Sequence, residues 1–308
     1  MKYAYDKGFK KVAVSLPFFG FLCKKAQRPM EKMLNKMEIP GKVSVRDFKI
    51  KGFKGEDIVV KEITPLITPL KTSDTAILVL HGGGFGYKMA PYQFHNACRY
   101  ADELGCKVFV PDYHLIPDFP FPAAYDDAML TYQYMVEGAQ ELEFNPVRIM
   151  VLGDSAGGAL AANVCNTAHA KGLPTPMCQI LIYPVIDCEM TTESMKKYPD
   201  TPMWNSKNNN RMWKMYLKNA SEQDKLIAVP IKNPLPEILP PTYIETAEFD
   251  CLHDEGILYA EHIKNVSKNI ELYETKGTVH GYDTLIGHDI SMNSMNRRIE
   301  FMKKWRDA

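Results

Sequence analysis

The sequence has no excess of charge of either sign, because 37 lysine and arginine residues balance 37 aspartate and glutamate residues. A chain without net positive charge lacks the electrostatic attraction on which most nucleic-acid binding depends. Nucleic acid is therefore not an expected partner. Internal repeats and low-complexity tracts are also absent from the sequence, so a repeat architecture is not expected either.

The sequence has no pair of cysteines with CxxC spacing, and its seven cysteines are scattered and odd in number. A disulfide framework is therefore not expected, and the pattern indicates reduced, mostly buried thiols in a cytoplasmic protein. An HExxH motif and any tight group of cysteine and histidine residues are missing as well. We therefore expect neither a metal ion nor another cofactor.

The sequence has no apolar run long enough to span a bilayer as a helix. The run Val12–Cys23 follows several lysines and in that respect resembles the start of a secretory signal, but no small-x-small cleavage site comes after it. We expect instead an N-terminal segment that covers an apolar surface, without stable insertion into a membrane.

What the sequence does contain is the composition of a globular protein with a sizeable core, with 308 residues of which 45% are hydrophobic and 24% charged. From residue 45 onward, short β-rich runs alternate with helical stretches. Strands are predicted at Val45–Ile50, Ile58–Ile63, Ala76–Leu80, Val108–Pro111, Ile149–Leu152, Ile180–Tyr183, Tyr243–Thr246 and Ile270–Tyr273. Helices are predicted at Tyr92–Leu104, Tyr125–Glu137 and Ala156–Ala170.

The alternation of strands and helices predicts an α/β fold with a central, mostly parallel sheet and helices on both faces. The last five strands are continuous apolar or β-branched runs, which is typical of strands buried on both faces. The first two strands, joined by a turn at Gly52–Gly55, are expected to form an antiparallel lead-in.

Two segments lie outside the alternation, namely residues 1–44 and 188–225, and we expect them to combine into a small helical cap. Residues 45–187 and 226–308 would then form the two parts of the α/β core. The insertion contains Trp204, Met212 and Trp213, and such large or adaptable side chains suit a substrate pocket. They suit an ordinary hydrophobic core equally well.

The motif GDSAGG, residues 153–158, stands between a predicted strand and a predicted helix. The pattern Gly-x-Ser-x-Gly in that context predicts a nucleophile elbow, in which a strained turn presents Ser155 above the carboxyl edge of the sheet. The alternative is a glycine-rich turn in which the serine merely caps the helix.

A serine nucleophile needs donors for the oxyanion and a base. The motif HGGGFG, residues 81–86, directly follows a predicted strand and has the pattern of an esterase oxyanion loop. We expect the backbone N–H groups of Gly83, Gly84 and Ala156 to form the oxyanion hole, with His81 supporting the loop. A flexible glycine loop without such a role is the alternative.

The order of a triad in this architecture is serine, acid, histidine. His280 follows the last predicted strand and is the expected base, with His288 as the second candidate. Asp250 follows the strand Tyr243–Thr246 and is the expected acid, with Glu248 as the second candidate. The two carboxylates just beyond, at residues 254 and 255, are expected in the first turn of the next helix.

With these residues identified, the chain resembles the hormone-sensitive-lipase family of α/β-hydrolases, in particular its small bacterial esterases. The resemblance extends from about residue 75 to the end. It is carried by HGGGFG (81–86), PDYHLIPDFPFPAAYDD (111–127), GDSAGG (153–158), EFDCLHDEG (248–256) and GTVHGY (277–282). It implies a serine carboxylesterase with a helical cap. It assigns by motif position the same nucleophile, acid, base and oxyanion donors: Ser155, Asp250, His280, Gly83, Gly84 and Ala156.

The chain departs from the family pattern at a few positions away from the triad. His114 and Ile116 stand where the family usually has Arg and Ala, Asp118-Phe119 replaces Glu-His, and His253 stands where Arg is frequent. These differences concern local ion pairs and pocket detail, and they leave the expected reaction unchanged.

The resemblance and the bulky residues of the insertion favour short acyl chains on a small-molecule ester. An amidase or peptidase with the same triad remains an alternative, as does a ligand receptor on the same fold, although a receptor is expected to have lost its base. A lipase that acts at an interface is less expected, since no long amphipathic lid is evident. A homodimer is expected from the resemblance and from a last strand that we place at the edge of the sheet.

Overall fold

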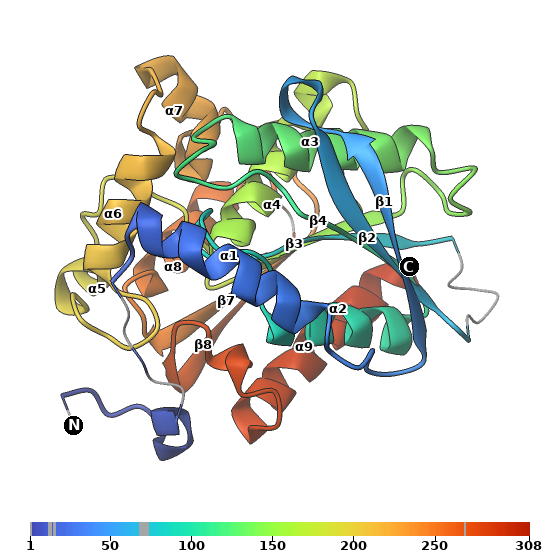
Figure 1. The fold of residues 1–308 in the computed structure, drawn as a ribbon. Helices are drawn as coiled ribbons and strands as arrows, with labels where there is room; N and C mark the ends of the chain where they lie inside the picture. The colour runs from blue at the N-terminus through green and yellow to red at the C-terminus, as the bar shows by residue number, and fades with distance from the viewer. Residues whose placement is uncertain (1, 12–13, 15–16, 68–73, 268) are drawn as a thin grey trace.

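One eight-stranded sheet forms the centre of the protein (Figure 1). The computed structural model describes residues 2–11, 14, 17–67, 74–267 and 269–308. The strands are β1 (Val43–Lys51), β2 (Asp57–Pro65), β3 (Ala76–Leu80), β4 (Lys107–Pro111), β5 (Ile149–Asp154), β6 (Gln179–Ile182), β7 (Thr242–Phe249) and β8 (Ile270–Val279). Their order in the sheet is β1-β2-β4-β3-β5-β6-β7-β8.

The sheet is parallel from β4 to β8, while β1 and β2 pair antiparallel with each other and β2 pairs antiparallel with β4. The predicted α/β fold with an antiparallel lead-in is therefore confirmed. Because parallel strands need crossovers, the long helices follow the strands and cover both faces. These helices are α2 (Pro91–Leu104), α3 (Ala123–Glu137), α4 (Ala156–Thr167), α8 (His253–Ile263) and α9 (Asp289–Arg306).

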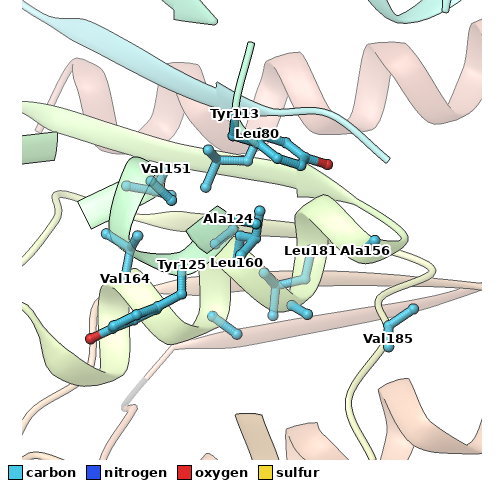
Figure 2. Close-up of a cluster of buried hydrophobic side chains, with 14 of the residues drawn as sticks. Leu80, Tyr113, Ala124, Tyr125, Val151, Ala156, Leu160, Val164, Leu181 and Val185 are labelled. Carbon is cyan, nitrogen blue, oxygen red and sulfur yellow. The ribbon is translucent and has the colours of Figure 1, made fainter. Parts of the chain in front are cut away.

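The alternation of side chains along each strand divides the core into two layers. Leu78 and Leu80 of β3 point to the layer beneath α3, α4 and α8, whereas Ile77 and Val79 point to the layer beneath α2 and α9. Figure 2 shows part of the first layer, where Leu80 lies near residues of α4 such as Leu160. All five residues of β3 are buried, as expected for a central strand.

The expectation that the last strand is buried on both faces is wrong. β8 lies at the edge of the sheet beside β7 alone, and most of its first seven residues are exposed or half-buried. Leu272 is 41% exposed and Tyr273 is 36% exposed. β8 is the last strand of the sheet, so only β7 pairs with it, and its apolar side chains stay partly exposed.

The two segments outside the alternation are helical and lie against each other (Figure 1). The first contains η1 (Lys7–Lys11) and α1 (Gly20–Leu34), and the second contains α5 (Glu193–Lys197), α6 (Ser206–Tyr216) and α7 (Glu222–Ala228). The Phe18 N–H donates to Asn208 Oδ1 at 2.9 Å, and the ring of Phe18 packs edge-on against Trp204 at 5.2 Å. We refer to these two segments together as the cap.

The boundaries of the cap differ slightly from the predicted ones. β1 begins at Val43, two residues before the predicted strand, and α7 continues to Ala228, beyond the predicted end of the insertion at residue 225. The remaining short 3-10 helices are η2 (Phe53–Gly55), η3 (His169–Lys171), η4 (Pro230–Lys232) and η5 (Tyr282–Thr284). Across the described residues, every helix is too short or too polar to cross a bilayer.

Candidate active site

Ser155 stands at the junction of β5 and α4 in a strained conformation, with φ 54° and ψ −119°. A Cβ at Gly153 would come within 2.1 Å of the Gly157 carbonyl oxygen, and a Cβ at Gly157 would come within 1.9 Å of the Leu80 carbonyl oxygen. Larger residues do not fit at either position, which explains the Gly-x-Ser-x-Gly spacing. The Ser155 side chain makes no capping hydrogen bond, so the simple helix-cap alternative does not describe this turn.

Three side chains from three separate loops meet at the carboxyl edge of the sheet. Ser155 Oγ lies 2.9 Å from His280 Nε2, and His280 Nδ1 lies 2.6 Å from Asp250 Oδ2. Asp250 directly follows β7 and His280 directly follows β8, so the parallel strands deliver both side chains to the same edge. Asp250 is fully buried, and its Oδ1 accepts the N–H of Leu252 at 3.0 Å, which fixes the carboxylate.

The second candidates for acid and base have other partners. Glu248 Oε2 accepts the backbone N–H of Gly277 at 2.7 Å. His288 caps α9 through Nδ1, which accepts the N–H of Ile290, and its Nε2 faces Asp6 at 3.3 Å. Neither side chain takes part in the hydrogen-bonded chain that ends at Ser155 Oγ.

The glycine loop after β3 lies beside Ser155, and Gly83 and Gly84 both line the same cavity as the serine. Gly83 has φ 121° and Gly84 has φ 61°, conformations that L side chains rarely adopt. Among the residues that the structure describes, none accepts a hydrogen bond from the N–H of Gly83 or Gly84. These N–H groups are thus free to bind a ligand. Ala156 occupies the first position of α4, where the N–H also has no partner within the helix.

His81 supports the glycine loop from behind. Its Nδ1 lies 2.8 Å from the Gly82 carbonyl oxygen, and its ring stacks on Tyr113 with a centroid distance of 4.3 Å. The Tyr113 hydroxyl donates to the His81 carbonyl oxygen at 2.6 Å. Burial lowers the pKa of His81, so the imidazole is neutral at pH 7.

Asp154, which the sequence did not single out, connects the glycine loop to the turn that carries Ser155. Its carboxylate accepts the N–H of Gly82 at 2.9 Å and an N–H of Gln93 Nε2 at 2.8 Å. Burial raises the pKa of Asp154 to about 6, against the lowering effect of those two hydrogen bonds. The position of this acid directly before the elbow serine was the available signal.

A cavity of about 680 Å³ opens above Ser155 and His280, and its lining is mostly apolar. Trp204 lines this cavity, but Met212 and Trp213 do not, and that part of the predicted pocket is corrected. Met212 and Trp213 are buried in the core, where the ring of Trp213 contacts Phe85 and Tyr216. The cap supplies further lining residues that the sequence did not single out: Val14, Phe18, Leu22, Met30 and Met203.

The described residues contain no group of three or more His, Cys, Asp or Glu side chains placed to hold a metal ion. All seven cysteines carry free thiols, and all except Cys188 are buried. Burial raises the pKa of Cys98 and of Cys106 to about 12, so both remain neutral thiols at pH 7.

A serine, a histidine and an aspartate joined by hydrogen bonds at the carboxyl edge of a mostly parallel sheet, next to a glycine loop with unused N–H groups, define the α/β-hydrolase class. The chain belongs to this family. The family model described as "alpha/beta hydrolase fold" matches residues 77–284. This match and the esterase relatives described next confirm the resemblance to the hormone-sensitive-lipase type that the motifs indicated.

Several relatives and solved structures resemble the chain over most of its length. An ethyl acetate hydrolase of Pseudomonas putida is 27% identical over 274 residues, which cover 87% of this chain and 85% of that protein. The carboxylesterase NlhH of Mycobacterium tuberculosis is 30% identical over 237 residues, which cover 75% and 73%. The structure of a bacterial heroin esterase superposes with a TM-score of 0.83 at 29% identity, covering 94% of both chains.

Proposed function

We propose that this protein hydrolyses carboxylic esters with short acyl groups through an acyl-enzyme intermediate on Ser155. Membership of the carboxylic ester hydrolases follows from the esterase relatives of the chain, one of which is 30% identical over 75% of the chain. The serine mechanism is supported above all by one observation. Ser155 Oγ, His280 and Asp250 form a continuous hydrogen-bonded chain with distances of 2.9 and 2.6 Å.

In this mechanism His280 Nε2 takes the Ser155 proton as Oγ attacks the ester carbonyl carbon. The carbonyl oxygen becomes an oxyanion and accepts hydrogen bonds from the N–H groups of Gly83, Gly84 and Ala156. His280 then gives the proton to the leaving alcohol oxygen, and the C–O bond breaks. A water molecule attacks the acyl-enzyme by the same route and releases the acid. Asp250 holds the imidazole and stabilises its charged form.

The short acyl preference is supported by the crowding next to the glycine loop. A Cβ at Gly84 would come within 2.8 Å of Trp204 and 3.0 Å of Phe18, so aromatic rings stand directly against the oxyanion donors. Trp204 also lies near His280, with ring centroids 6.2 Å apart. An acyl chain beside these rings would have little room. The remainder of the cavity extends to Leu22 and Met30 of α1, and we assign the alcohol part of the substrate to it.

A ligand receptor on this fold has no need of a base in contact with the serine. The close approach of His280 Nε2 to Ser155 Oγ therefore supports catalysis over ligand sensing. The same serine, histidine and aspartate can also cleave amide bonds. Assays on both ester and amide substrates are therefore needed to distinguish an esterase from an amidase.

The test is hydrolysis of p-nitrophenyl esters from acetate to laurate, beside a p-nitroanilide series, by the wild type and Ser155→Ala. Ser267→Ala is the matched control, because Ser267 is equally buried but precedes β8 at the opposite edge of the sheet. We expect turnover of short esters that Ser155→Ala abolishes and Ser267→Ala retains. Activity that survives Ser155→Ala contradicts the serine mechanism, preference for laurate contradicts the short acyl site, and turnover of anilides alone indicates an amidase.

A further inference from the structure

The two hydrogen bonds of the His280 ring only weakly restrain tilting of the imidazole out of its plane. Both bonds are made by ring nitrogens, one to Asp250 and one to Ser155, and the N–H and the lone pair of these nitrogens lie in the plane of the imidazole. Such bonds resist displacement along their length, but their energy changes slowly with small tilts of the ring out of its plane. Catalysis needs the ring held within a narrow range of orientation, so contacts against the ring are required as well.

Tyr183 supplies a contact of this kind. Its ring packs against the His280 imidazole with a centroid distance of 4.7 Å and an interplanar angle of 60°. Tyr183 directly follows β6 and has φ 35°, a left-handed conformation that is rare outside glycine. Residues in such conformations persist where the surroundings hold them, and they cluster at functional sites. Here the strained backbone accompanies an edge-type contact between the Tyr183 ring and the imidazole.

The hydroxyl group of Tyr183 is tied to the loop that carries His280. It donates to Asp283 Oδ2 at 3.2 Å, and Asp283 stands three positions after the histidine. Arg298 Nη1 donates to the same Asp283 oxygen at 2.8 Å. The Tyr183 ring, the loop and α9 are therefore connected through one carboxylate.

Arg298 is fully buried, and besides Asp283 it contacts Tyr282 and Glu245. Its Nη2 donates to the Tyr282 hydroxyl at 2.9 Å and to Glu245 Oε1 at 2.6 Å. The backbone N–H of Tyr183 donates to the carbonyl oxygen of the same Glu245 at 2.6 Å. Buried charges that are paired and hydrogen-bonded in this way have few alternative arrangements, which makes the cluster a rigid support.

We propose that Tyr183 is a positioning residue for His280, and that Asp283 and Arg298 fix Tyr183 in the orientation that restrains the imidazole. The inference rests on the proposed serine mechanism, in which His280 is the base. It assigns a catalytic consequence to the ion pair of Asp283 with Arg298, which touches neither the substrate nor the reacting atoms.

Tyr183→Phe is the direct test, because it keeps the aromatic ring and removes only the hydroxyl that reaches Asp283. Tyr243→Phe is the matched control. Tyr243 is equally buried and donates to Glu245 Oε2 at 2.6 Å within the same cluster, but it pairs through its ring with Tyr273 and Phe301, away from His280. Both variants lose one buried tyrosine hydroxyl from the Arg298 cluster, and only one of them lies against the base.

We expect Tyr183→Phe to lower kcat by about 10- to 100-fold with KM unchanged, as a small misplacement of a catalytic group does. Tyr243→Phe should keep kcat within about twofold while losing a comparable amount of thermal stability. Equal kcat values for the two variants overturn the proposal, even when Ser155→Ala shows that the serine mechanism is correct.

A second measurement is independent of turnover. The imidazole proton shared between His280 Nδ1 and Asp250 should give a far-downfield proton NMR signal. We expect this signal to shift or broaden in Tyr183→Phe and to stay unchanged in Tyr243→Phe. An unchanged signal in both variants contradicts the proposal. If Tyr183→Phe does not fold, Asp283→Asn tests the same link, with an intermediate loss of kcat expected and wild-type kcat overturning the inference.

Discussion

The backbone N–H of Gly82 donates to Asp154 Oδ1 at 2.9 Å, although the two residues are 72 positions apart in the chain. Gly82 precedes the expected oxyanion donors, and Asp154 precedes the expected nucleophile. One buried carboxylate thus joins the glycine loop to the turn that carries Ser155. Gln93 Nε2 donates to the other oxygen of the same carboxylate at 2.8 Å and holds it from α2.

This link predicts different results for two substitutions of Asp154. Asp154→Asn keeps an oxygen that accepts the Gly82 N–H, and we expect kcat to stay within about tenfold of the wild type. Asp154→Ala removes the acceptor and releases the loop, so kcat should fall by about 100-fold. Steady-state kinetics with a short p-nitrophenyl ester checks both. Asp112→Ala is the control, since this half-buried acid pairs with Lys88. Wild-type kcat in Asp154→Ala contradicts the role of the link.

The glycine loop itself predicts a second effect. A Cβ at Gly83 would come within 2.8 Å of the Tyr87 carbonyl oxygen, so Gly83→Ala must shift the backbone that carries the expected donor. We expect a loss of about 10²- to 10³-fold in kcat, the magnitude associated with the loss of one oxyanion donor.

Gly172→Ala is the matched control for backbone strain. Gly172 also has a positive φ, 73°, but a Cβ there meets nothing within 4 Å. Both variants therefore carry the strain of alanine in the left-handed region, and only Gly83→Ala should lose activity. Equal kcat values in the two variants would contradict the assignment of the Gly83 N–H as a hydrogen-bond donor to the oxyanion.

Much of the fold and of the hydrogen-bonded chain at Ser155 could be predicted because local sequence constraints are strong there. The buried runs of β3 and β5 are short, continuous and apolar, which is typical of strands in a sheet covered on both faces. The glycines around Ser155 are required because a Cβ at Gly157 would come within 1.9 Å of a backbone oxygen, so the motif and the turn specify each other. Chain order and position after the strands then favoured Ser155, Asp250 and His280, with Glu248 and His288 as second candidates.

The lining of the cavity could not be predicted in the same way. Trp204 and Trp213 belong to the same insertion and have the same chemistry, but one faces the cavity and the other faces the core. Trp204 packs against Phe18 and Trp213 packs against Phe85, and both contacts join residues far apart in sequence. The pairing of Tyr183 with Asp283 depends on such a distant contact too, over 100 positions.

The exposed edge at β8 makes the expected homodimer testable. Leu272 is 41% exposed on this strand, and an unprotected edge favours pairing with a second copy. We propose that the protein is a dimer at micromolar concentration and that Leu272→Lys converts it to a monomer. Leu258→Lys is the control, because Leu258 is 44% exposed on α8 rather than on the edge strand. Light scattering that gives a monomer for the wild type contradicts the proposal.

The buried carboxyl of Glu255 predicts how stability depends on pH. Its Oε2 accepts the N–H groups of Ile186 and Asp187 at 2.8 and 3.0 Å, while burial raises its pKa from 4.5 to about 8. The folded protein therefore binds this proton more tightly than the unfolded chain does. It follows that the contribution of Glu255 to the free energy of unfolding falls as pH rises from about 4.5 to about 8, by about 1.4 kcal/mol per pH unit.

Glu255→Gln keeps a carbonyl oxygen for the two N–H groups but cannot ionise. Glu255→Gln should therefore become more stable relative to the wild type as pH rises. We expect the difference in the free energy of unfolding, variant minus wild type, to increase by a few kcal/mol between about pH 5 and about pH 8. Urea denaturation at the two pH values measures the difference. Glu193→Gln, at an exposed position in α5, should follow the wild type at both pH values. If the free energy of unfolding of Glu255→Gln changes with pH by the same amount as that of the wild type, this carboxyl does not carry a raised pKa in the folded protein.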